Sequence, residues 1–144
     1  MNVFERTNVR YLKVSEIGGP GDLVVADLSF ISLRTVLPRL AALCGDKGDL
    51  LMLVKPQFEA GRVEAARVQG IIRNPDVWRR VLEEISECVS ETCLGVAGLM
   101  ISPLRGVGGN TEFFMHSQAG AGDAIQVTDA INKVVDEAKG EAMS

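Results

Sequence analysis

Two short apolar stretches, Asp22–Asp27 (DLVVAD) and Asp49–Val54 (DLLMLV), decide the fold class of this chain of 144 residues. Each stretch begins at an aspartate and continues without polar alternation, which is typical of a strand buried on both faces of a parallel sheet. Leu94–Ser102 (LGVAGLMIS) repeats the pattern further along the chain. These three stretches predict the centre of a β-sheet.

Two helical patterns lie between the predicted strands. Residues 33–43 and residues 75–89 both place apolar side chains on one helical face, and the second segment opens with a proline, which favours a helix start. Ser29 and Ser32 are candidate N-caps of the first helix. Pro38 predicts either a kink in that helix or a later start.

The alternation of strands with helices predicts right-handed βαβ units, and therefore an α/β fold with three layers and a mostly parallel sheet. Only a loop separates the last two predicted strands, so one strand near the C-terminus should be antiparallel to its neighbours. No repeat or shift in composition divides the chain, which predicts a single domain, 1–144. The remaining predicted elements are short strands at Asn2–Glu5 and Thr111–Met115, a long functional or mobile loop at 55–74, a flexible stretch at 117–122 and a helix at 124–138.

Composition limits the classes of function. Fifteen Lys and Arg against 19 Asp and Glu give a net charge of −4, and such a chain is predicted to be a poor autonomous binder of nucleic acid. Neither a signal peptide nor an apolar run of membrane-spanning length is found, which favours the cytoplasm. Three cysteines without a CxxC pattern and a single histidine offer no recognisable cluster of ligands, so no metal is predicted.

Charged residues stand at three of the predicted strand boundaries. Asp27 follows the first apolar stretch, Lys55 follows the second, and Glu112 lies next to the last strand. Ligands collect at the carboxyl ends of parallel strands, and a charge in such a place is costly unless it is paired. The three side chains therefore form either one functional site or a set of strand ends around a structural ion pair.

Four segments resemble the motifs of a known family: ERTNVRYL (5–12), VVADLSFIS (24–32), LVKPQFEAGR (53–62) and SPLRGVGGNTEFF (102–114). They are similar to those of the hemolysin A or TlyA-like proteins, which belong to the FtsJ-type RNA ribose 2′-O-methyltransferases. The resemblance extends from about Val3 to His116. It implies a Rossmann-like S-adenosylmethionine methyltransferase sheet, S-adenosylmethionine as cofactor and RNA of the rRNA type as substrate.

The resemblance also implies a catalytic tetrad of Lys, Asp, Lys and Glu. Asp27 matches the aspartate of that tetrad, Lys55 its second lysine and Glu112 its glutamate. By this implication Lys55 accepts or orients the proton of a ribose 2′-hydroxyl, while Asp27 and Glu112 position the lysine amines.

Further residues are implied as contacts of cofactor and substrate. Asn8, Ser29 and Asp27 match positions beside the cofactor, and Ser29 is equally interpreted as a helix cap. Arg105, close to Glu112 in the sequence, is a candidate for binding the RNA substrate together with the lysine of the tetrad.

The chain departs from the family pattern at its beginning. The glycine-rich cofactor loop, the first lysine of the tetrad, the first two strands and a small basic RNA-binding domain should all precede ERTNVR, and none is found in this sequence. A partial methyltransferase-like domain without a separate RNA-binding domain is therefore expected. The strand at 22–27 would then become an exposed apolar edge, which predicts either self-association through this strand or repositioning of the strand at Asn2–Glu5 onto it.

Two functions remain open from the sequence. The first is S-adenosylmethionine-dependent 2′-O-methylation of ribose in RNA by Asp27, Lys55 and Glu112. The alternative is a catalytically inactive remnant, or an assembly module, that retains the fold without binding the cofactor.

Overall fold

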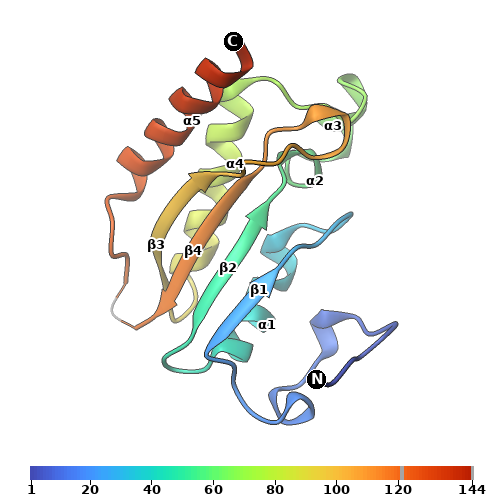
Figure 1. Ribbon diagram of the computed structural model, residues 1–144, viewed down its shortest axis with the longest axis vertical. Helices are drawn as coiled ribbons and strands as arrows, with labels where there is room; N and C mark the ends of the chain where they lie inside the picture. Colours follow the sequence, from blue (N-terminus) through green and yellow to red (C-terminus); the bar gives the residue numbers. More distant parts are fainter. Residues whose placement is uncertain (121, 144) are drawn as a thin grey trace.

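Four strands form one sheet in the computed structural model, which describes residues 1–120 and 122–143 (Figure 1). The strands are β1 (Leu23–Ala26), β2 (Asp49–Val54), β3 (Leu94–Ile101) and β4 (Phe113–Ala119). The helices are α1 (Leu33–Cys44), α2 (Pro56–Glu59), α3 (Arg62–Arg67), α4 (Pro75–Ser90) and α5 (Val127–Met143), with 3₁₀ turns η1 (Val9–Tyr11), η2 (Val14–Ile17) and η3 (Val107–Gly109).

The strand order in the sheet is β1-β2-β4-β3. β1 and β2 are parallel, with Leu23 opposite Asp49, whereas β4 is antiparallel to both β2 and β3. The predicted α/β class and the single antiparallel strand near the C-terminus are confirmed. β1, β2 and β3 run in the same direction, and β4 is the one strand among the described residues that opposes them; because β4 lies between β2 and β3, two of the three pairings are antiparallel.

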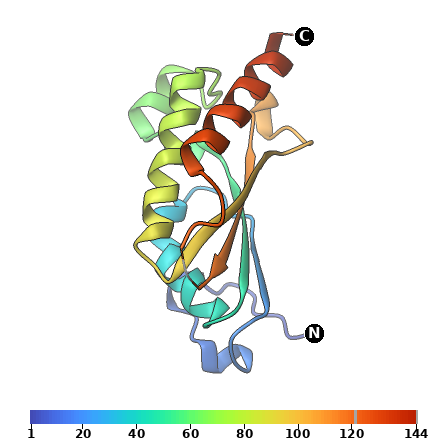
Figure 2. The same ribbon diagram turned by 90° about the vertical axis from the view of Figure 1, so that its left-hand side faces the viewer.

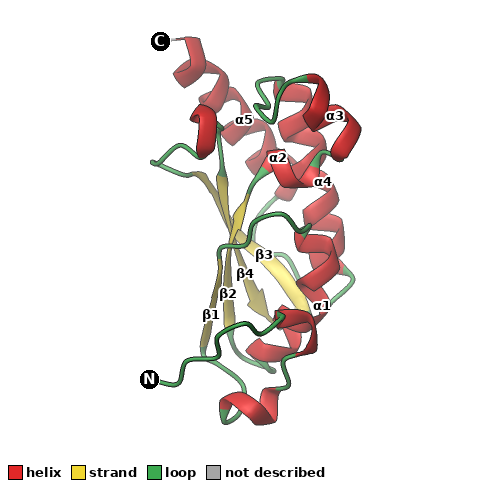
Figure 3. Cartoon of the chain, turned by 90° about the vertical axis from the view of Figure 1, so that its right-hand side faces the viewer, coloured by secondary structure: helices red, strands yellow, loops and turns green. Residues whose placement is uncertain are grey.

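The helices α1, α4 and α5 lie on one face of the sheet (Figures 2 and 3). Along β2, Leu50, Met52 and Val54 are fully buried, while the alternate residues Leu51 and Leu53 are only half-buried on the opposite face. The described residues thus form two layers, and the predictions of three layers and of strands buried on both faces are wrong for this part of the chain. The largest fully buried side chains of the core are Trp78, Phe113, Leu37, Leu50, Met52, Leu82, Ile85 and Met115.

Local signals account for the two long helices that were predicted. The Ser32 side chain accepts a hydrogen bond from the backbone of Arg34 and caps α1, so Ser32 and not Ser29 is the N-cap. The helix continues through Pro38. Asn74 caps α4 in the same way, with Pro75 in the first turn, as predicted.

Other boundaries differ from the predictions. Asn2–Glu5 does not form a strand, and the chain continues through Arg6, with a φ of 53°, toward η1. The segment 55–74 contains the short helices α2 and α3. β4 extends to Ala119 and includes residues predicted to be flexible, because it pairs along its length with strands on both sides. No helix in residues 1–120 or 122–143 is both long and apolar enough to cross a membrane.

β1 is an edge of the described sheet and pairs only with β2 there (Figure 1). Two of its four residues point their side chains into solvent: Leu23 is 62% exposed and Val25 is 63% exposed. An apolar edge strand of this kind offers unpaired backbone groups to another chain. Self-association through this edge, predicted from the sequence, therefore stays a prediction.

We expect Val25→Lys to weaken that association, because a charge on an edge strand disfavours pairing with a second strand. Sedimentation equilibrium over a range of concentrations should show a mass above that of the monomer for the wild type and a lower mass for the variant. Val63→Lys is the matched control, since Val63 is 70% exposed but belongs to α3. A wild-type chain that stays monomeric at every concentration would contradict the prediction.

Candidate functional site

Lys55 and Asp27 meet at the carboxyl edge of the parallel strand pair. Lys55 follows β2 and Asp27 follows β1, so the parallel pairing of these strands places the two residues next to each other. The Lys55 Nζ lies 2.6 Å from Asp27 Oδ1 and donates a hydrogen bond of 3.1 Å to Ser29 Oγ. The side chain of Lys55 is 13% exposed and that of Asp27 is 65% exposed. Three of the predicted site residues therefore form one cluster.

Glu112 is held separately from this cluster. It is 7% exposed, and its Oε2 accepts a hydrogen bond of 2.8 Å from the side-chain Nε2 of Gln57. No hydrogen bond or ion pair joins Glu112 to Lys55 in the described ranges. The carboxylate lies against the backbone of Gly106, where a β-carbon would collide with it.

The turn Lys55–Glu59, which contains α2, connects the two parts of the site. Lys55 contacts the Asp27 cluster, and Gln57, two residues later, contacts Glu112. The ring of Phe58 lies 4.9 Å from the ring of Phe30, centroid to centroid, beside the first cluster. This five-residue segment thus fixes Lys55 and Glu112 relative to each other without a direct bond between them.

Phe30 stands at the rim of the site in an unusual backbone conformation. Its φ is 64°, and the residue is 89% exposed. A bulky residue with positive φ is strained, and such strain concentrates at functional sites. Phe30, Ser32, Gln57 and Phe58 line a hollow together with Gly61 and residues of α3.

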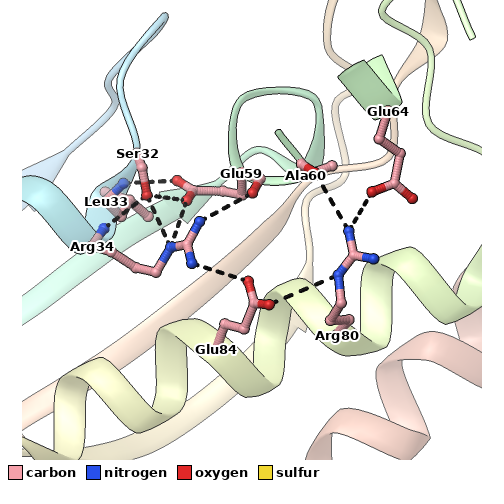
Figure 4. A network of polar contacts seen from close by, with 8 residues as sticks. All are labelled: Ser32, Leu33, Arg34, Glu59, Ala60, Glu64, Arg80 and Glu84. Carbon is pink, nitrogen blue, oxygen red and sulfur yellow. Dashed lines mark hydrogen bonds and ion pairs between the residues drawn. The ribbon is translucent and has the colours of Figure 1, made fainter. Parts of the chain in front are cut away.

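Glu59 closes the turn and was missed by the sequence analysis. It is 4% exposed, and its carboxylate accepts hydrogen bonds from Ser32 Oγ at 2.6 Å and from the backbone N–H of Leu33 at 2.8 Å. These contacts satisfy free donors at the first turn of α1 and tie the site turn to that helix (Figure 4). The partners are more than twenty residues apart in the chain, so no local pattern identified the contact.

A chain of ion pairs extends from this point across the helices (Figure 4). Arg34 of α1 lies 3.3 Å from Glu84 of α4, which also pairs with Arg80 at 3.8 Å. Arg80 in turn binds Glu64 of α3. The segment predicted as a loop at 55–74 is therefore held against α1 and α4 by charged contacts.

Two predicted residues make their contacts elsewhere. Arg105 donates to Thr111 Oγ1 and lies 3.3 Å from Glu141 of α5. Asn8 accepts a hydrogen bond from the backbone N–H of Arg10 and caps η1. Neither side chain is bonded to the Lys55 cluster in the described part of the chain, and their assignment to substrate and cofactor stays a prediction. No group of three or more His, Cys, Asp or Glu that could hold a metal is found among residues 1–120 and 122–143.

Burial raises the pKa of the Glu59 carboxyl, while the hydrogen bonds from Leu33 and Ser32 and the charge of Arg34 act in the opposite direction. A raised pKa means that the folded protein binds this proton more tightly than the unfolded chain does. Glu59 therefore contributes stability at low pH, and this contribution is lost as the pH rises through the raised pKa.

We expect Glu59→Gln to remove this pH dependence, because the amide keeps an acceptor but does not ionise. Urea denaturation should show that the wild type loses unfolding free energy relative to the variant as the pH rises from acidic to neutral. Glu83→Gln, an exposed position on α4, is the control and should show no such trend. If the unfolding free energies of the wild type and Glu59→Gln changed with pH in parallel, ionisation of Glu59 would not destabilise the folded state and the prediction would be wrong.

Known proteins resemble this chain over most of its length. It is 38% identical over 138 residues to the 16S/23S rRNA (cytidine-2′-O)-methyltransferase TlyA of Mycobacterium tuberculosis, covering 94% of this chain and 51% of that protein. It is 40% identical over 140 residues to YqxC of Bacillus subtilis, named as a candidate rRNA methyltransferase, covering 94% and 50%. Hemolysin A of Brachyspira hyodysenteriae is 30% identical over 94 residues, which cover 65% of this chain and 39% of that protein. No protein-family model matches the chain.

Solved structures share the fold. A candidate hemolysin from Streptococcus thermophilus superposes with a TM-score of 0.87 at 35% identity, covering 96% of this chain and 50% of that chain. A candidate hemolysin from Lactococcus lactis gives a TM-score of 0.82 at 31% identity, covering 92% and 65%. The resemblance predicted from the sequence motifs is confirmed. The chain spans about half the length of the curated relatives TlyA and YqxC.

Proposed function

We propose that this chain, a homologue of the TlyA and hemolysin A proteins, carries part of a Rossmann-like methyltransferase domain that methylates ribose 2′-hydroxyls of rRNA. The observation that carries the proposal is the Lys55 ammonium held at 2.6 Å from Asp27 at the carboxyl edge of the sheet. This edge is where ligands bind in open α/β sheets. An rRNA substrate also implies a cytoplasmic location.

The donor set at the edge fits S-adenosylmethionine, whose sulfonium would supply the electrophilic methyl group. Only one oxygen of Asp27 is engaged by Lys55 in the described residues, and the side chain is 65% exposed. Its carboxylate therefore keeps a free side for a cationic ligand. Ser29 adds a hydroxyl next to it, and Asn8 joins this set from the family resemblance.

Lys55 is suited to orient the ribose hydroxyl. An ammonium group has three N–H donors, and Asp27 and Ser29 take two of them. The third donor has no hydrogen-bond partner among residues 1–120 and 122–143 and would hold the 2′-oxygen with a lone pair along the line of attack. The oxygen–methyl bond would form as the sulfur–methyl bond breaks, S-adenosylhomocysteine would leave, and the hydroxyl proton would pass to solvent water. Orientation of this kind accounts for a large part of the rate in transfer reactions.

Glu112 and Arg105 complete the proposed site from the other side. Glu112 is a buried carboxyl group that Gln57 links to the turn carrying Lys55. Arg105 would bind an RNA phosphate, for which its guanidinium must exchange Glu141 for the phosphate oxygens.

A non-catalytic assembly module is the second candidate. It is favoured by the β1 edge, where Leu23 and Val25 are exposed. In that case the pair of Lys55 and Asp27 serves only to satisfy two charges at the strand ends.

We expect the chain to bind S-adenosylmethionine with micromolar affinity in a calorimetric titration, and Asp27→Ala to abolish the heat. Methyl transfer to ribosomal RNA, followed with radiolabelled cofactor, should fall by about 100-fold or more in Lys55→Ala, because the hydroxyl is no longer oriented. Lys47→Ala, at an exposed position before β2, is the matched control and should be fully active. The absence of heat at millimolar cofactor would refute the enzymatic proposal for this chain and support the assembly module.

A further inference from the structure

We infer that Gln57 is a positioning residue that fixes the carboxylate of Glu112 for the reaction. The inference rests on the proposed function for the role of Glu112. The contact itself, and its effect on the carboxylate, are independent of that function and are tested separately below.

Gln57 is placed for this role by the turn that carries Lys55. The two residues lie two positions apart in the segment that ends in α2, and Pro56 at the first helical position restricts the backbone between them. The amide Nε2 of Gln57 donates to Glu112 Oε2 at 2.8 Å. Any movement of Lys55 with this turn therefore also displaces the carboxylate.

The pocket around Glu112 leaves its carboxylate little freedom. Glu112 is 7% exposed, and Gln57 holds it on one side. Gly106 lies against the same oxygen, Oε2, and a β-carbon there would overlap the carboxylate and come within 3.3 Å of Gln57 Nε2. The absence of a side chain at Gly106 and the amide of Gln57 together define one orientation for Glu112.

The carbonyl oxygen of the Gln57 amide distinguishes a positioning role of this residue from a packing role. Its Oε1 is buried and has no hydrogen-bond partner in the described residues. A buried polar atom without a partner is unfavourable, and an apolar side chain of similar length would fill the same space without it. Within the described part of the chain, the amide is used through its N–H donor, which bonds to Glu112.

Gln57→Met removes the donor and keeps the length of the side chain, and Gly106→Ala displaces the carboxylate by direct steric contact with it. With carbon-13-labelled glutamate, we expect the side-chain carboxyl signal of Glu112, assigned through Glu112→Gln, to move in both variants. Gln126→Met and Gly98→Ala are the controls, because Gln126 is exposed and a β-carbon at Gly98 meets only an ordinary contact of 3.7 Å. An unchanged Glu112 signal in Gln57→Met would overturn the inference.

The kinetic measurement uses the same four variants. Gln57→Met and Gly106→Ala should lower kcat by about 100-fold with the KM for S-adenosylmethionine unchanged. Displacement of the Glu112 carboxylate disturbs the orientation of the reacting groups but does not weaken cofactor binding. An unchanged kcat would show that Gln57 has a structural role alone. If the wild type transfers no methyl group, the proposed function fails, and the carboxyl signal still decides whether Gln57 positions Glu112. Because the two variants act through different contacts of Glu112, the test stays valid if one of them does not fold.

Discussion

The parallel pairing of β1 with β2 is the constraint on which the site depends. It sets the carboxyl ends of two strands next to each other, so that Asp27 and Lys55 emerge as neighbours and form a close ion pair. An ammonium group that is mostly removed from water is costly unless an opposite charge compensates it. The strand register and the charge pair therefore support each other, and a shift in register by one residue would separate them.

The segment from Lys55 to Glu59 connects this ion pair to the rest of the site. Alternate side chains reach three separate places: Asp27, Glu112 and the first turn of α1. Glu59 anchors the end of the turn to a helix that the ion pairs of Figure 4 connect with α4. Five consecutive residues thus define the relative positions of groups from three separate parts of the chain.

The sequence predicted those elements whose signals are local. Asn74 and Pro75 mark the start of α4, and the apolar run at 49–54 marks β2, because capping and hydrophobic pattern are properties of neighbouring residues. The strand expected at Asn2–Glu5 did not form, since a strand also requires a partner that a local pattern cannot supply. The same limit explains why the contacts of Glu59, Gln57 and Arg105 were not predicted. Each is decided by a residue distant in the chain.

The one-sided covering of the sheet affects how the isolated chain behaves in solution. The side chains of Val25, Leu51 and Phe114 lie on the face that carries no helix, where a hollow of about 410 Å³ is bordered by Leu51, Phe114 and their neighbours. Contiguous apolar surface of this kind attracts other apolar surfaces. The purified chain should therefore bind hydrophobic dyes and chromatography resins, and its solubility should improve with mild detergent.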